Sequence, residues 1–105
     1  FNTNEGMLKF TANPVLDSVA KVAKEYDKTT LQVIGYTDST GNDTINVPLS
    51  QKRAAAVNEY LVLRGINPVR IKSMGLGSQN PIADNKTAQG REQNRRVEIY
   101  LINQN

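Results

Sequence analysis

The chain has 105 residues, 38% of them hydrophobic and 22% charged, and a formal net charge of +3. This length and composition predict one domain, residues 1–105, with a single modest core. Cysteine and histidine are absent, which excludes disulfides, Cys-based metal sites and histidine acid–base chemistry. The thirteen lysines and arginines are dispersed without a basic run, so we expect no nucleic-acid partner.

The N-terminal part predicts a strand remnant followed by an amphipathic helix. Phe1 to Asn4 is interpreted as the tail of a strand or as a loop. Asn13 is a suitable N-cap and Pro14 fits the first helical position. A helix reaching about Asp27 is indicated by apolar residues at helical spacing: Val15, Leu16, Val19, Val22, Ala23 and Tyr26.

The middle of the chain predicts a strand, a turn and a second helix. Residues 31–37 are rich in β-formers and apolar on both parities, as in a strand covered on both faces. A polar turn cluster follows at 39–44. Asn46 is predicted to cap the next helix, with Pro48 in its first turn and Gly65 as its stop.

The last third predicts a strand at 69–74, a long loop with a short helical turn at 88–93, and a final strand. In that strand Val97, Ile99 and Leu101 are predicted to face the core, with Arg96, Glu98 and Tyr100 on the outer face. The whole order predicts an α+β sandwich of the βαβαβ type, with two long helices on one face of the sheet.

Arg53 is the first candidate for chemistry. On a helical wheel it lies near the centre of an apolar arc formed by Leu49, Ala56, Val57, Tyr60, Leu61 and Leu63. An unpaired charge there costs several kcal/mol, so the guanidinium needs a partner or water. Two interpretations stay open: Arg53 binds a ligand, or its stem packs at the rim of the core with its head in solvent.

Asp38 is the second candidate. An aspartate between a strand and Ser-Thr-Gly is, by itself, most simply a turn residue that bonds nearby backbone amides. The turn, however, leads directly into the helix of Arg53, whose N-terminus carries unpaired N–H groups and a partial positive charge. Asp38 and Arg53 together predict a small site for a zwitterion, with the aspartate taking an ammonium and the arginine a carboxylate.

The remaining motifs give little chemistry. Arg95 shares the parity of Val97 and is predicted to end the core-facing row, whereas Arg96 is predicted to form a surface ion pair with Glu98. GLGSQN lacks the third glycine and the helix of a phosphate-binding loop, and DSTGND lacks EF-hand spacing. Without histidine, no serine has an activating base. We expect no catalytic residue, no cofactor and no metal.

Several motifs together resemble a known family. They are GYTDSTG at 35–41, N-x-x-L-S-x-x-R-A at 46–54, Gly-Leu-Gly at 75–77, Asn-Pro-Ile at 80–82 and Asn-Arg-Arg-Val-Glu-Ile at 94–99. In order and spacing they resemble the OmpA-like peptidoglycan-binding domain over nearly the whole chain. The resemblance implies a mixed sheet of about four strands. The residues 1–4 resemble the end of the family's first strand, so we expect that strand to be truncated.

The resemblance also implies a function. It implies non-covalent binding of the meso-diaminopimelate in the peptide stem of peptidoglycan, which anchors an outer-membrane protein or lipoprotein to the wall. The expected location is the periplasmic face of the outer membrane, with the membrane attachment in a part of the protein outside this chain. The alternative is an anchoring domain of an envelope machine, of the flagellar-stator or secretion-system type.

The family's ligand residues fall on particular positions of this chain. Its aspartate falls on Asp38 and its arginine on Arg53; supporting contacts fall on Asn4, Thr40, Asn46 and Arg95. Two positions depart from the family pattern, since Tyr36 stands where histidine is common and Asn2 where aspartate is frequent.

Overall fold

The structure, a computed structural model, describes residues 7–11 and 16–103. The predicted strand remnant at 1–4, the helix cap at 13–14 and the candidate site residue Asn4 therefore lie outside the described residues. None of the helices in the described ranges is long and apolar enough to cross a membrane.

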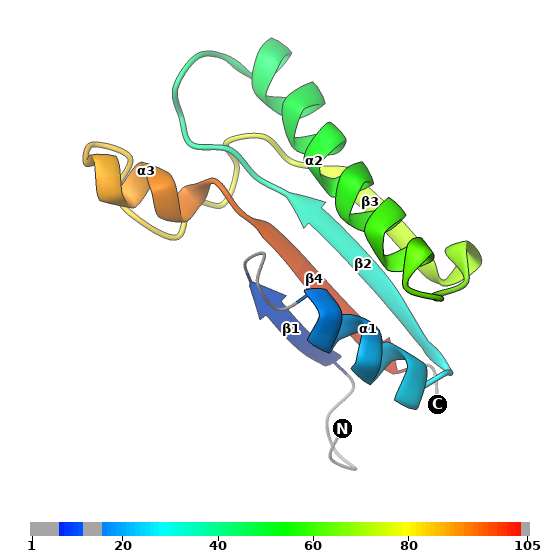
Figure 1. Ribbon diagram of the computed structural model, residues 1–105. Coiled ribbons are helices and arrows are strands. Elements are labelled where there is room, and N and C mark those ends of the chain that lie inside the picture. The colour runs from blue at the N-terminus through cyan, green and yellow to red at the C-terminus, as the bar shows by residue number, and fades with distance from the viewer. Residues whose placement is uncertain (1–6, 12–15, 104–105) are drawn as a thin grey trace.

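The centre of the fold is a mixed four-stranded sheet (Figure 1). Its strands are β1 (Met7–Thr11), β2 (Thr29–Gly35), β3 (Ile71–Gly75) and β4 (Val97–Asn103), in the order β1-β4-β2-β3. Strand β4 runs antiparallel to both β1 and β2, whereas β2 and β3 are parallel. The predicted mixed sheet is confirmed. Strand β1 was not predicted from the sequence.

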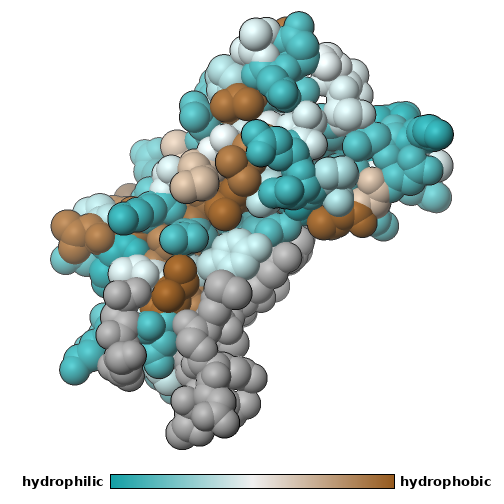
Figure 2. Space-filling view, turned by 180° about the vertical axis from the view of Figure 1, so that it is seen from behind, coloured by the Kyte–Doolittle hydropathy of each residue, from teal (hydrophilic) through white to brown (hydrophobic). Residues whose placement is uncertain are grey.

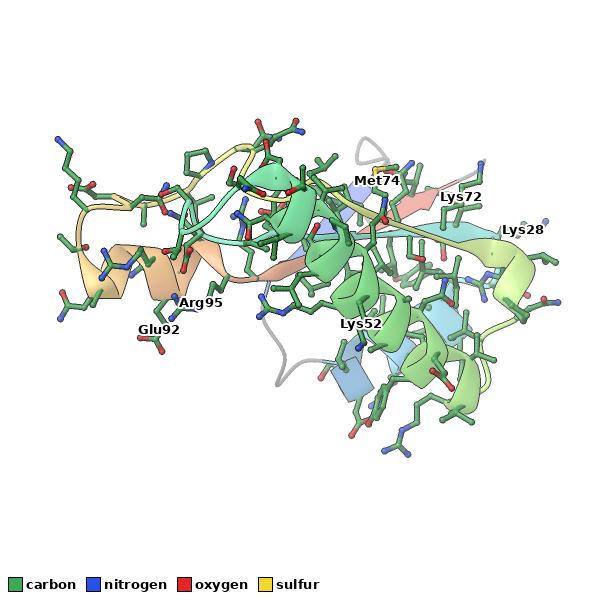
Figure 3. The ribbon with its side chains drawn as sticks, turned by 90° about the horizontal axis from the view of Figure 1, so that it is seen from above. Lys28, Lys52, Lys72, Met74, Glu92 and Arg95 are labelled. Atoms are coloured by element: carbon green, nitrogen blue, oxygen red, sulfur yellow. The ribbon has the colours of Figure 1, made fainter. Side chains whose placement is uncertain are left out.

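Helices α1 (Leu16–Glu25) and α2 (Asp43–Leu63) lie on the same face of this sheet (Figures 1 and 3). The core between them and the sheet contains Val19 and Ala23 of α1, Ala54, Val57 and Leu61 of α2, and Leu31, Val33, Val97, Ile99 and Leu101 of the strands. The predicted α+β sandwich is therefore confirmed. Burial of this apolar surface is the main force that holds the two layers together.

The start of α2 differs from the prediction, whereas its end agrees. The N-cap is Asn42 and not Asn46, so Pro48 lies inside the helix. Because proline has no N–H, the carbonyl of Thr44 receives no helical hydrogen bond from position 48. Thr44 lies on the exposed first turn, where water can replace that bond. At the other end, Gly65 has φ +101° and its N–H bonds the Val62 carbonyl at 2.9 Å. This left-handed glycine ends the helix as predicted.

The buried stripe of α2 is narrower than the apolar arc predicted by the wheel. It consists of Asn46, Ser50, Ala54, Val57 and Leu61. Leu49 and Leu63 are exposed, at 38% and 80%, and Ala56 is exposed as well, so the prediction was wrong for these three members of the arc. Arg53 lies beside this stripe and is half-buried.

Close contact between α2 and the sheet requires glycine at the ends of β2 and β3. A Cβ at Gly35 would lie 2.1 Å from the backbone oxygen of Ser50, and one at Gly75 would lie 2.2 Å from the backbone nitrogen of Gln51. Only glycine therefore lets the helix backbone cross the strand ends at this distance. The buried hydroxyl of Ser50 also accepts the N–H of Gly77 at 3.0 Å.

The C-terminal elements follow the prediction with shifted boundaries. A short 3₁₀ turn, η2 (Pro68–Arg70), occupies the start of the segment that was predicted as strand, and β3 begins after it. The predicted helical turn is α3 (Ala88–Asn94), which lies beyond the ends of β2 and β4 (Figure 1).

The outer face of β4 corrects one prediction. Val97, Ile99 and Leu101 are buried as expected, but Arg96 and Glu98 are also buried, with 7% and 3% exposure. Their ion pair, 2.7 Å between Arg96 Nε and Glu98 Oε2, is thus not a surface pair. Arg96 stacks on the Tyr36 ring at 3.9 Å and donates to the Asn80 carbonyl at 2.8 Å.

Farther along the same face, the sheet is more open. Figure 2 shows this side, with hydrophobic side chains gathered between hydrophilic ones. Lys72 and Met74 of β3 point to this side, away from α2 (Figure 3), and Met74 is 46% exposed.

Candidate functional site

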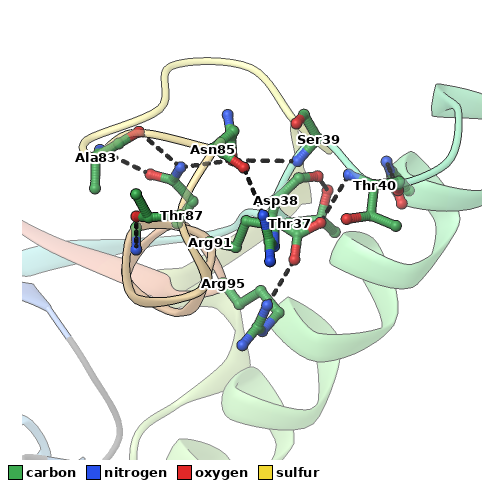
Figure 4. A network of polar contacts seen from close by, with 12 residues as sticks. Thr37, Asp38, Ser39, Thr40, Ala83, Asn85, Thr87, Arg91 and Arg95 are labelled. Atoms are coloured by element: carbon green, nitrogen blue, oxygen red, sulfur yellow. Dashed lines mark hydrogen bonds and ion pairs between the residues drawn. The ribbon is translucent and has the colours of Figure 1, made fainter.

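Asp38 lies three residues beyond the end of β2, and its carboxylate contacts two residues, Thr40 and Arg95 (Figure 4). Its Oδ1 accepts the backbone N–H of Thr40 at 2.8 Å, and its Oδ2 forms an ion pair with Nη1 of Arg95 at 2.6 Å. Only 11% of the aspartate side chain is exposed. Asp38 is therefore a turn residue, as the simpler interpretation required, and also the partner of a charge.

These contacts keep Asp38 ionised. Burial raises the pKa of its carboxyl group, but the amide of Thr40, the guanidinium of Arg95 and the Thr40 hydroxyl together outweigh burial and lower that pKa. At neutral pH the site therefore contains a fixed negative charge. A carboxylate has about four acceptor positions, more than these contacts use, so Asp38 retains room for a further donor.

The lowered pKa predicts a pH dependence with a definite sign. The stability that Asp38 contributes is fully present above the unfolded pKa of about 3.9 and is lost as the pH falls through the lower folded pKa. A ¹³C titration of the Asp38 carboxyl should have its midpoint below that of an unfolded aspartate. Arg95→Gln should move the midpoint upward; an Asp38 that titrates at or above its ordinary pKa would contradict the ion pair.

Arg53 lines a pocket of about 420 Å³ next to this ion pair. The other lining residues come from α2 and from the segment that enters β4: Ala56, Val57, Arg95, Arg96 and Val97. Within the part of the chain that the structure describes, Arg53 forms no ion pair, because the ion pairs there involve Arg64, Arg95 and Arg96. Its guanidinium is therefore available to an anion that enters the pocket.

Arg95 connects the two predicted site residues. It contacts Asp38 directly and lines the same pocket as Arg53. The prediction that Arg95 ends the core-facing row was wrong: its side chain is 42% exposed, because it follows the end of α3 and turns toward Asp38. Arg96 also lines the pocket but is paired with Glu98. The guanidinium groups of Arg53 and Arg95 and the nearby carboxylate of Asp38 suit a ligand with both an anionic and a cationic group.

The predicted supporting residues have different surroundings. Asn46 is buried, and its Nδ2 donates to the carbonyl of Thr40 at 3.0 Å, which fastens the loop of Asp38 to α2. The side chain of Thr40 is exposed at the edge of this loop.

Sequence reasoning missed a second polar network behind Asp38, in which Asn85 and Asn94 are central (Figure 4). In the sequence, Asn94 is only the first residue of the motif at 94–99, and no role is predicted for it. An isolated buried amide leaves no periodic signal, so only the fold reveals its contacts. No group of His, Cys, Asp and Glu suited to hold a metal occurs in the described ranges.

The fold and the site define a class: an α+β domain that presents a small, charged binding pocket at one end of a mixed sheet. The chain belongs to the OmpA family, whose model matches residues 1–95.

Among the proteins similar to this chain is the probable lipoprotein YiaD of Escherichia coli. It is 50% identical over 101 residues, which are 96% of this chain and 46% of that protein. The peptidoglycan-binding protein ArfA of Mycobacterium tuberculosis is 49% identical over 87 residues, covering 83% of this chain and 27% of that protein. The chain therefore spans about half of the first relative and about a quarter of the second.

Solved structures show the same fold. The peptidoglycan-associated lipoprotein of Burkholderia pseudomallei superposes with a TM-score of 0.79 at 25% identity, over 92% of this chain and 90% of that one. The cell wall anchor of the type VI secretion system (T6SS) of Pseudomonas aeruginosa gives a TM-score of 0.75 at 32% identity, over 87% of this chain and 66% of that one.

Proposed function

We propose that this domain binds peptidoglycan non-covalently through the zwitterionic end of diaminopimelate in the peptide stem. The observation that carries the proposal is the guanidinium of Arg53, which has no ion-pair partner among residues 7–11 and 16–103 and lines a pocket together with Arg95, the partner of Asp38. Membership of the OmpA family and the likeness to a peptidoglycan-binding protein and to a cell wall anchor support the choice of polymer.

The roles of the residues follow from their charges. Arg53 donates two parallel hydrogen bonds to the ligand carboxylate, a contact for which the planar guanidinium is suited. Asp38, anionic at neutral pH, accepts the ligand ammonium with the acceptor positions that Thr40 and Arg95 leave free. Asn46 holds the loop from behind. No bond is made or broken, so the proposed activity is non-catalytic.

We place the domain on the periplasmic face of the outer membrane, attached through a part of the protein outside this chain. There it tethers an outer-membrane protein or lipoprotein to the wall. A weak single site is sufficient for this task, because many domains facing many stems act together. Anchoring of an envelope machine is the second candidate, favoured by the likeness to the T6SS anchor. A single transmembrane helix preceding the domain, in place of a lipid-attachment cysteine or a barrel, would support it.

Competition with stem peptides tests the ligand chemistry. A tripeptide that ends in meso-diaminopimelate should displace the domain from insoluble peptidoglycan. The same tripeptide with the distal carboxylate amidated keeps the ammonium and the shape but removes the charge that Arg53 reads, so it should compete at least tenfold less well, the effect of about 1.4 kcal/mol. A tripeptide with lysine at this position should compete equally poorly. Equal competition by all three peptides would contradict the proposed role of Arg53.

A further inference from the structure

Asn94 is a fully buried amide at the end of α3, with 0% exposure. Its Oδ1 accepts the backbone N–H groups of Ile82 and Ala83 at 2.8 and 3.0 Å. Its Nδ2 donates to the carbonyl of Ala83 at 3.0 Å and to Oδ1 of Asn85 at 2.8 Å. Both ends of the amide are therefore used, and the residue fastens the 82–85 loop to the end of the helix. Arg95, the partner of Asp38, follows it directly in the chain.

Asn85 continues the network to the loop of Asp38 (Figure 4). Its Oδ1 accepts from Asn94 and, in a longer contact of 3.3 Å, from the backbone N–H of Ser39. Its carbonyl accepts Nη1 of Arg91 at 2.9 Å. The loop of Asp38 is thus joined to α3 twice, once through Arg95 and once through Asn85.

The 82–85 loop and α3 also pack too closely to move independently. A Cβ at Gly90 would lie 1.8 Å from the backbone oxygen of Asp84 and 2.7 Å from its carbonyl carbon. The first turn of α3 is capped by the hydroxyl of Thr87, which accepts the N–H of Gly90 at 2.9 Å. Loop and helix therefore form one unit that carries Arg95.

We propose that Asn94 and Asn85 are positioning residues. They hold Arg95 and the loop of Asp38 in a fixed position relative to each other and do not contact the ligand. The inference rests on the proposed function of the pocket. An exposed arginine has many rotamers, and ordering them costs free energy on binding. The network pays part of this cost before the ligand arrives, because it fixes the backbone on both sides of the ion pair. Its loss leaves the site present but loose, which weakens binding.

The two asparagines differ in their hydrogen-bonding roles, and the test uses this difference. Asn85 is used as an acceptor at Oδ1, a task that an aspartate also performs. Asn94 must donate as well as accept. At pH 7, Asn85→Asp should bind insoluble peptidoglycan within about twofold of the unmodified domain. Asn85→Leu removes the acceptor of two hydrogen bonds, and Asn94→Asp removes the donor of two. Each variant should bind at least about tenfold more weakly, because the loss of a single hydrogen bond in a buried network already has about this effect.

A matched control is Asn58→Leu, the same chemical change at an amide whose Nδ2 contacts Ser73 of β3, since neither residue lines the pocket. It should leave binding unchanged. Thermal melts will show whether Asn94→Asp still folds, and Asn85→Leu, at a partly exposed residue, tests the inference if it does not.

A second measurement separates this inference from the proposed function. In Asn85→Leu the ¹³C titration of Asp38 should move upward, toward the ordinary aspartate pKa, because the ion pair with Arg95 loosens. This readout needs no ligand, so failure of the unmodified domain to bind peptidoglycan would reject the function and leave the positioning role testable. An Asn85→Leu variant with unchanged binding and an unchanged Asp38 titration would overturn the inference.

Discussion

Arg53→Ala should abolish retention of the domain on insoluble peptidoglycan, and Asp38→Ala should do the same. Removing one partner of a buried, hydrogen-bonded charge pair costs about 2–5 kcal/mol of binding free energy, enough to eliminate a weak single-site interaction. Arg53→Lys should also bind poorly, because an ammonium cannot reproduce the two parallel contacts of a guanidinium. Co-sedimentation with purified cell wall measures the effect.

The control for charge alone is Lys52→Ala, which removes a positive charge from the adjacent, exposed position of α2 (Figure 3). It should be retained like the unmodified domain. Circular dichroism spectra and melting curves should remain close to normal for Arg53→Ala, whose side chain lies beside the buried stripe of α2. Full retention of both Arg53→Ala and Asp38→Ala would remove the basis of the proposed site.

Arg96→Ala should have the largest effect on folding. The substitution removes the buried ion pair with Glu98, the stacking on Tyr36 and the bond to the Asn80 carbonyl. Breaking a buried ion pair in this way costs about 3–5 kcal/mol, a large part of the 5–15 kcal/mol that stabilises a typical domain. Urea denaturation followed by circular dichroism should therefore show a much lower midpoint.

A matched comparison is Arg64→Ala on the other side of the molecule. Arg64 pairs with Asp17 at 3.1 Å, but the two side chains are 51% and 69% exposed. Exposed ion pairs contribute little to stability because solvent screens the two charges, so this variant should unfold near the normal midpoint. If Arg96→Ala and Arg64→Ala unfolded at the same urea concentration, the buried Arg96–Glu98 pair would contribute no more to stability than the exposed Arg64–Asp17 pair, which would contradict the prediction.

The sequence predicted the elements that depend on local patterns. The stop of α2 at Gly65 requires only a residue that tolerates positive φ, and the alternation of Val97, Ile99 and Leu101 follows from the geometry of one strand. The candidate site was also indicated in part, since Asp38 and Arg53 lie at the strand end and on the helix where the sequence placed them. Their roles as ligand residues remain a prediction.

The features that the sequence did not predict all depend on distant segments. Arg96 was expected at the surface because parity places it opposite the core, but the segment around Asn80 covers that face. Arg95 does not face the core, because its side chain contacts Asp38, which is 57 positions away in sequence. Periodicity contains no information about such contacts.

The position of Arg53 relative to the sheet depends on the lack of a side chain at Gly35 and at Gly75. Gly35 and Gly75 allow the backbone of α2 to touch the strand ends at Ser50 and Gln51, immediately before Arg53. A methyl group at either glycine would lift this part of the helix and carry the guanidinium outward with it. Under the proposed function, we therefore expect substitutions at Gly35 or Gly75 to weaken ligand binding, although they leave every charged group of the pocket in place.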